Sequence, residues 1–367
     1  MKLNLIAIVF TLLWLPMQAQ LVRRTLEEAG LKVGNTLPSP LFVHDTLKNK
    51  VPMETVLKGH YTVIVTGCLT CPVFYRTYPG IEALHRDYAS KGVQFYYLYK
   101  LLAHPENNGY INAFTIEERF KHIEEAKKKL QTKVPWLADP MTNEVSHTFA
   151  TASNAEFLFG PDGKIVYMNL WSNADQLRSA LEKSVGKVAN KTDPASLHLP
   201  KVVGKSSVAQ GVAPRITVDP DRQLIPILVK PQQDTSTYFV KLRAEADDSL
   251  FFSGTGKMYL GFHLDPLHHV HWNNLAAPLK YQISVPKGTA LWPAQAEAPV
   301  IEQESDLDPR EFLVDVKNWN SEKPIDLTVR YFACDENDKW CIAVEQHYQV
   351  LLALDPSGGR VYDRSFR

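Results

Sequence analysis

Two cysteines separated by two residues are the clearest chemical signal in this chain of 367 residues. Cys68 and Cys71 lie in TGCLTCPVF (66–74), after an apolar run and directly before a proline. Such a pair can exchange disulfides, form an inert disulfide or supply half of a zinc site. A cross-link around so short a loop adds little stability, and the sequence has no second Cys-x-x-Cys or His-x-x-His nearby. The pattern therefore favours redox chemistry without a metal or cofactor.

The proline after the second cysteine indicates which sulfur attacks. Proline suits the first turn of a helix, so a helix that begins at Pro72 would have Cys71 as its N-cap. Unpaired N–H groups and the helix dipole favour a thiolate at that position. Cys68 lies in the loop that leaves the preceding strand and lacks this help. We therefore predict that Cys71 is the attacking thiolate and Cys68 the resolving cysteine.

Cys334 and Cys341 form a second close pair, across an acidic loop between two expected strands. Four cysteines allow three pairings, and proximity in sequence favours the local ones. The second pair can be a structural disulfide that closes the loop or a pair that exchanges. His269 and His271 would share one face of a strand and could bind a metal. Because no third ligand is fixed, a polar strand face is the preferred interpretation.

The residues around the first pair alternate between strand and helix patterns. Thr115 with Glu118 forms a capping box for one helix, and Ser172 and Asp175 are expected to cap a later one. This order predicts a mixed α/β unit over about 35–186, with its site where strands end and helices begin. The expected strands are 61–66, 92–100 and 134–139, followed by a hairpin over 156–169.

The second half of the chain has a different pattern. Residues 187–212 are rich in Pro, Ser, Gly and Lys and lack aromatic side chains, which predicts a linker or an extended strap. From about Arg215 onward no segment has a helical period. Spaced short strands without helices predict an all-β sandwich over 213–360. The clearest expected strands are 240–246, 312–319, 325–332 and 347–355.

The first half resembles the iodothyronine deiodinase family, a branch of the thioredoxin superfamily, in three motifs that occur in order. GCLTCPVF is similar to the family signature, with Cys71 at the selenocysteine position and Thr70 at the family threonine. LYKLLAHPENNGY (98–110) places His104 on a family histidine, and AEFLFGPDGKIVY (155–167) is similar to the hairpin before the last helix. The resemblance implies a thioredoxin-like fold. His104 would be a proton carrier or, alternatively, a polar loop residue.

The chain also departs from the deiodinase pattern. Cysteine replaces selenocysteine at position 71, Leu102 stands where the family has glutamate, and Asn154 replaces a proline that is usually cis. Cys68 is an added cysteine that makes the site a dithiol. These departures favour thiol–disulfide exchange over deiodination. Deiodinase-like and thiol peroxidase activity remain alternatives.

The second half resembles the periplasmic N-terminal domain of the electron-transfer protein DsbD. LDPLHHVHWNNL (264–275), LWPAQ (291–295) and the late pair Cys334/Cys341 carry this resemblance, although the family pair is one residue closer. The resemblance implies an immunoglobulin-like sandwich. If the linker is a flexible coil of about 27 residues, it spans roughly 25 to 30 Å. We therefore expect that the two cysteine pairs can exchange electrons within one molecule.

The N-terminus and the charge balance predict where the protein works and what it meets. Lys2, an apolar run and a cleavage region ending at Ala19 are typical of a signal peptide over 1–19. We expect an exported protein, periplasmic or secreted, with no stable membrane insertion. The 40 basic and 40 acidic residues form no long like-charged block, which argues against nucleic-acid partners. Protein or small-molecule thiols and disulfides are the expected partners. A non-catalytic envelope protein with two static disulfides is the alternative.

Overall fold

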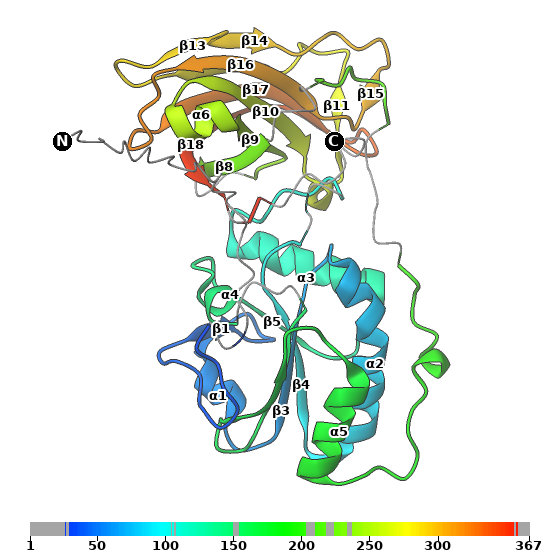
Figure 1. Cartoon of the computed structure of the whole chain (residues 1–367). Helices are drawn as coiled ribbons and strands as arrows, with labels where there is room; N and C mark the ends of the chain where they lie inside the picture. The colour runs from blue at the N-terminus through cyan, green and yellow to red at the C-terminus, as the bar shows by residue number, and fades with distance from the viewer. Residues whose placement is uncertain are drawn as a thin grey trace, which may run out of the picture.

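The computed structural model describes residues 26, 29–103, 105, 108–149, 154–202, 210–217, 224–232, 237–355 and 357–358. The predictions for the signal peptide and for His104 lie outside these residues. The described chain forms two units, each with its own sheet and core (Figure 1). We call them the α/β unit, from β1 to α5, and the β unit, from β8 to β18.

The α/β unit has a seven-stranded sheet, counted over the described residues, in the order β2-β1-β5-β4-β3-β6-β7. Strands β3, β4 and β5 are parallel, whereas β6 and β7 return antiparallel at one side. This arrangement is a thioredoxin-like fold, as predicted. The strands are β1 (Phe42–His44), β2 (Lys50–Pro52), β3 (Thr62–Gly67), β4 (Gln94–Tyr99), β5 (Trp136–Ala138), β6 (Glu156–Phe159) and β7 (Ile165–Asn169). The helices are α1 (Met53–Leu57), α2 (Pro72–Tyr88), η1 (Ala89–Lys91), α3 (Ile116–Leu130), α4 (Glu144–Thr148) and α5 (Ala174–Val185).

Both faces of this sheet are covered, which explains why β3 is apolar along its whole length. Successive strand residues point to opposite faces. Val63 and Val65 pack into one core with α2, α3 and α5, whereas Ile64 packs into a second core with α1 and α4. The buried central strand therefore fixes the position of the residues that follow it.

The helix caps test the predictions at single residues. Thr115 accepts the N–H of Glu118 at 3.2 Å and is the N-cap of α3, as predicted. The prediction for α5 is wrong by one residue, because Asn173 is its N-cap. Ser172 instead donates its hydroxyl to the buried carboxylate of Glu156 at 2.9 Å. A buried acceptor therefore uses the hydroxyl that was expected to cap the helix.

Residues 188–202 form a strap that packs along α2 (Figure 1). Its 3-10 turn η3 (Pro194–Leu197) lies against α2. The N–H of Thr192 donates to Asp87 at 3.0 Å, and the hydroxyl of Tyr78 donates to the carbonyl of Pro200 at 2.8 Å. These contacts hold residues 188–202 against the α/β unit.

The β unit is antiparallel, with eleven strands in a single hydrogen-bonded sheet that curls on itself over the described residues (Figure 1). This continuous pairing does not confirm an immunoglobulin-like sandwich. A short helix, α6 (Asp248–Ser253), also interrupts the region expected to have none. The strands are β8 (Leu224–Pro231), β9 (Val240–Asp247), β10 (Gly256–Leu264), β11 (Val270–Asn273), β12 (Lys280–Ser284), β13 (Ala290–Trp292), β14 (Gln295–Glu297), β15 (Ser305–Asp306), β16 (Arg310–Lys317), β17 (Ile325–Asp335) and β18 (Cys341–Leu354), with a 3-10 turn η4 (Pro266–His268) before β11.

Candidate functional site: a buried dithiol at the start of α2

Cys71 is the N-cap of α2, as the proline predicted. The N–H of Phe74 donates to the Sγ atom of Cys71 at 3.4 Å. Neither Cys68 nor Cys71 is part of a disulfide, and each is about 1% exposed. The helix dipole and the N–H groups of the first turn therefore act on Cys71 and favour its thiolate.

Cys68 has a different environment. The N–H of Ala103 donates to the Sγ atom of Cys68 at 3.2 Å, and the hydroxyl of Thr70 lies 3.7 Å from it. Burial raises the pKa of the Cys68 thiol well above its ordinary value, and the neighbouring Cys71 raises it further. The hydrogen bonds from Ala103 and Thr70 offset part of this rise. Cys68 is therefore held as a thiol, which suits a resolving cysteine.

Thr70 joins the dithiol to the β4–α3 loop (residues 100–115). Its hydroxyl donates to the carbonyl of Ala103. Ala103 therefore bonds the loop to this turn through both its backbone N–H and its backbone C=O. From the other side, the hydroxyl of Tyr75 donates to the carbonyl of Leu69. Leu102 of this loop is buried in the same core cluster as both cysteines. Because both thiols are buried, a substrate can reach the sulfurs only after a local movement of the chain.

Phe74 lies three residues after Cys71 and is part of the core. Its ring centroid lies 5.0 Å from that of Tyr97 and 5.4 Å from that of Trp136. A Cβ atom on Gly67 would lie 2.6 Å from the Phe74 ring. Glycine is thus required at the end of β3 so that the aromatic side chain fits beneath it.

Asn154 ties the end of β3 to α2. Its side-chain amide donates to the carbonyl of Thr66 at 3.0 Å, and its amide oxygen accepts the hydroxyl of Thr77 at 2.9 Å. Leu102, at the expected glutamate position, is buried and donates its N–H to Asn112 at 3.0 Å. The departures from the deiodinase pattern are therefore built into the packing around the dithiol.

Sequence reasoning missed a row of polar residues at the ends of the parallel strands. Gly67 of β3 pairs with Tyr99 of β4, which pairs with Ala138 of β5. Each of these three is followed at once by an ionisable residue, in the order Cys68, Lys100, Asp139. In the sequence, the available signal was a polar residue directly after each of three apolar runs.

Cys334 and Cys341 form a disulfide, as proximity predicted. They face each other at the end of the β17–β18 ladder, with Cα atoms 4.1 Å apart. Cys334 is buried and Cys341 is exposed, and the side-chain amide of Asn273 donates to the Sγ atom of Cys341 at 3.3 Å. The cross-link thus joins a buried residue of β17 to an exposed residue of β18.

The two histidines near this disulfide do not share a strand face. His269 lies before β11 in a left-handed conformation, with φ 50°. It is paired with Glu336 at 3.4 Å, and His271 is paired with Asp338 at 2.9 Å. In the described chain, the group with metal-ligand spacing is Glu118, Asp265 and His268, and the ammonium group of Lys241 lies there. His269 and His271 are therefore each placed beside a carboxylate of the β17–β18 turn.

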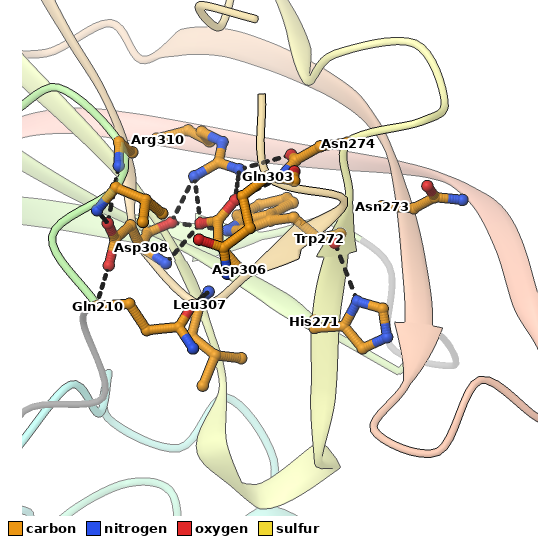
Figure 2. Close-up of polar contacts among 12 residues, drawn as sticks. Gln210, His271, Trp272, Asn273, Asn274, Gln303, Asp306, Leu307, Asp308 and Arg310 are labelled. Atoms are coloured by element: carbon orange, nitrogen blue, oxygen red, sulfur yellow. Dashed lines mark hydrogen bonds and ion pairs between the residues drawn. The ribbon is translucent and has the colours of Figure 1, made fainter. Parts of the chain in front are cut away.

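A buried polar network anchors the chain where it enters the β unit (Figure 2). Asp308 accepts the N–H of Gly211 at 3.1 Å and that of Ala213 at 2.8 Å. Arg310 donates to both carboxylate oxygens of Asp306 and lies 4.9 Å from the ring of Trp272. Figure 2 shows Arg310, Asp306 and Asp308 converging beside β11. Their donors and acceptors are used within the fold, so the network stabilises this region.

No protein-family model and no curated protein sequence matches this chain. Solved structures resemble its N-terminal part. A putative thiol:disulfide interchange protein DsbE from Chlorobium tepidum is 12% identical, with 42% of this chain and 99% of that chain covered and a TM-score of 0.34. A thiol:disulfide interchange protein from Bacteroides sp. is 20% identical, with 44% and 94% covered and a TM-score of 0.33. The thioredoxin domain of a thiol-disulfide oxidoreductase from Bacteroides vulgatus is 20% identical, with 42% and 99% covered and a TM-score of 0.33.

Proposed function

We propose that the protein is an exported thiol–disulfide oxidoreductase in which Cys71 attacks and Cys68 resolves. The observation that carries this proposal is the Sγ atom of Cys71 at the start of α2, with a free Cys68 three residues earlier. The signal-like residues 1–19 support export. Among the described residues, no helix has the length and apolar character needed to cross a bilayer.

The reaction has two exchange steps. The Cys71 thiolate attacks one sulfur of a substrate disulfide, and the other sulfur leaves as a thiolate that takes a proton. Cys68 then loses its proton and attacks the Cys71 sulfur of the mixed disulfide, which releases the second substrate thiol. The substrate disulfide gains two electrons and the Cys68–Cys71 pair loses them.

The surroundings of the dithiol favour this exchange over deiodination. The deiodinase family has an acid at the position of Leu102, whereas this side chain is buried and apolar. The β unit, by its resemblance to the DsbD N-terminal domain, would act as an immunoglobulin-like partner domain. The disulfide of this unit includes an exposed residue, Cys341, which supports that part of the proposal.

Trapping of mixed disulfides tests the order of attack. C68S should accumulate a mixed disulfide through Cys71 when it meets an oxidised protein substrate, and C71S should accumulate none. Peptide mass spectrometry identifies the sulfur involved. Mixed disulfides through Cys68 in C71S would contradict the proposed order.

Redox titration separates an enzyme from a static binding protein. A reduction potential for Cys68/Cys71 above about −300 mV supports exchange, whereas a lower value for both pairs supports two structural bonds. Rates with a peroxide, a protein disulfide and an iodinated phenol then rank peroxidase, exchange and deiodinase chemistry. We expect the protein disulfide to react fastest.

A further inference from the structure

Lys100 follows the last residue of β4, and Cys68 follows the last residue of the neighbouring parallel strand β3. The paired residues Gly67 and Tyr99 end β3 and β4, so Cys68 and Lys100 are the next residues on neighbouring strands. The Lys100 side chain is about 7% exposed, and the charge of Cys68 acts on it. A lysine so deeply buried is rare unless it is paired or has a chemical role.

The groups that face Lys100 set the charge of its amine. Asp139 follows β5 and is fully buried. Its carboxylate accepts the N–H of Val145 at 3.0 Å and of Ser146 at 2.9 Å, and Arg119 donates to its carbonyl. Burial lowers the pKa of Lys100 to about 8, although the charges of Asp139 and Cys68 oppose this shift. Near neutral pH the amine is therefore present in both its protonated and its neutral form.

Cys68 needs a proton acceptor because its surroundings keep it as a thiol. Burial and the neighbouring Cys71 oppose its ionisation, yet it must become a thiolate to attack the mixed disulfide. Cys71 has the start of α2 to stabilise its thiolate, and Cys68 does not share that position. A base at the ends of β3 and β4 could accept the proton of Cys68, whose thiolate the start of α2 is not placed to stabilise.

We propose that the neutral amine of Lys100 accepts the proton of Cys68 when Cys68 resolves the mixed disulfide, an inference that rests on the proposed function. The Cys68 thiolate forms a bond to the Cys71 sulfur, and the bond between Cys71 and the substrate sulfur breaks. The departing substrate thiolate then takes the proton from the Lys100 ammonium. The amine is neutral again at the end, and electrons move only between sulfurs.

Dithiobis(nitrobenzoate) separates the two steps in the full-length reduced protein. Attack by Cys71 releases one coloured thiolate, and resolution by Cys68 releases a second. Because this thiolate leaves without a proton, the second phase reports the ionisation of Cys68. In K100M we expect an unchanged first phase and a second phase slowed about 100-fold. In the wild type the second phase should rise with pH and level off above about pH 8, whereas in K100M it should not level off there.

Two further variants separate a proton acceptor from a positive charge. K100R keeps the charge but cannot give up a proton, so it should be as slow as K100M in the second phase. K133M removes an exposed lysine just before β5 and should react as the wild type does. Full recovery in K100R would overturn the proposal, because charge alone would then suffice.

The wild-type pH profile keeps the proposal testable if the variants fold poorly. A second phase that does not change from about pH 6 to about pH 10 would overturn it. A normal first phase with an unchanged second phase in K100M would overturn the role of Lys100 and leave the oxidoreductase assignment standing. A first phase that persists in C71S would overturn the attacking role of Cys71, and the Lys100 proposal with it.

Discussion

The ammonium group of Lys241 lies 2.8 Å from the carboxylate of Glu118, and this ion pair joins the two units. Glu118 is on α3 of the α/β unit, and Lys241 is on β9 of the β unit. Figure 1 shows α3 as the helix that faces the β unit. Lys241 also lies 2.8 Å from Asp265 and 4.9 Å from the ring of Phe114. One buried lysine therefore satisfies a carboxylate from each unit.

Removing Lys241 should destabilise the protein more than removing Glu118. K241M leaves two buried carboxylates without their cation, and we expect the free energy of unfolding to fall by about 3 to 5 kcal/mol. In E118Q the lysine keeps Asp265, so the loss should be smaller. Urea denaturation measures the loss of stability in both variants. The matched control is K257M, which breaks an exposed ion pair to Asp315. Equal losses in K241M and K257M would contradict this account.

Acid should remove the contribution of Glu118 in a defined pH range. Burial alone would raise the pKa of this carboxyl, but the nearby His268, with its Nε2 atom 3.9 Å away, and the Lys241 ammonium lower it to about 2, from an ordinary 4.5. A lowered folded-state pKa adds stability above pH 4.5, and this stability is lost as the pH falls towards about 2. The difference in unfolding free energy between wild type and E118Q should therefore shrink over this range. A difference that grows as the pH falls would show that the sign is wrong.

A methyl group at residue 67 should disturb the dithiol through Phe74. Because the added Cβ would lie 2.6 Å from the aromatic ring, G67A should destabilise the protein by about 1 to 3 kcal/mol. It should also slow attack by Cys71, since Phe74 donates the N–H that this sulfur accepts. F74L removes the clash, so the double variant should lose less stability than the sum of the single variants. Strict additivity would mean that the two positions do not clash.

Electron transfer between the two cysteine pairs stays a prediction. The docked strap replaces the flexible coil that motivated it, but Cys341 lies at an exposed position of the β unit. We expect that reducing Cys68/Cys71 leads to reduction of Cys334–Cys341 at a rate that does not depend on protein concentration. Alkylation and mass spectrometry at several dilutions measure this rate. If Cys334–Cys341 stays oxidised throughout, this disulfide has a structural role and only closes the β17–β18 hairpin.

Local features of the site could be predicted from the sequence because they depend on neighbouring residues. Pro72 is enough to place Cys71 at the start of a helix, and Thr115 caps its helix through a residue three positions away. The row formed by Cys68, Lys100 and Asp139 could not be found in this way. It depends on the register between strands that are far apart in the chain, and only the pairing of those strands brings the residues together.

In the β unit, too, the pairing of the strands could not be predicted from the sequence. Its strands alternate visibly in the sequence, but whether they form one sheet or two depends on which strands pair. β12 joins β17 to β14, and the pairing continues through β17 into the rest of the sheet. The short helix α6 carried local signals at both ends, with Asp247 as its N-cap and Gly254 as its C-cap, and was still missed.

The burial of both thiols would set an upper limit on how fast the dithiol can react. Each cysteine is about 1% exposed, and Ala103 of the β4–α3 loop is hydrogen-bonded to Thr70 and to the Sγ atom of Cys68. At high substrate concentration, the frequency at which this loop opens would become the slowest step. Chemically different disulfides would then approach the same plateau rate, and saturation would be observed even for reagents that do not bind to the protein.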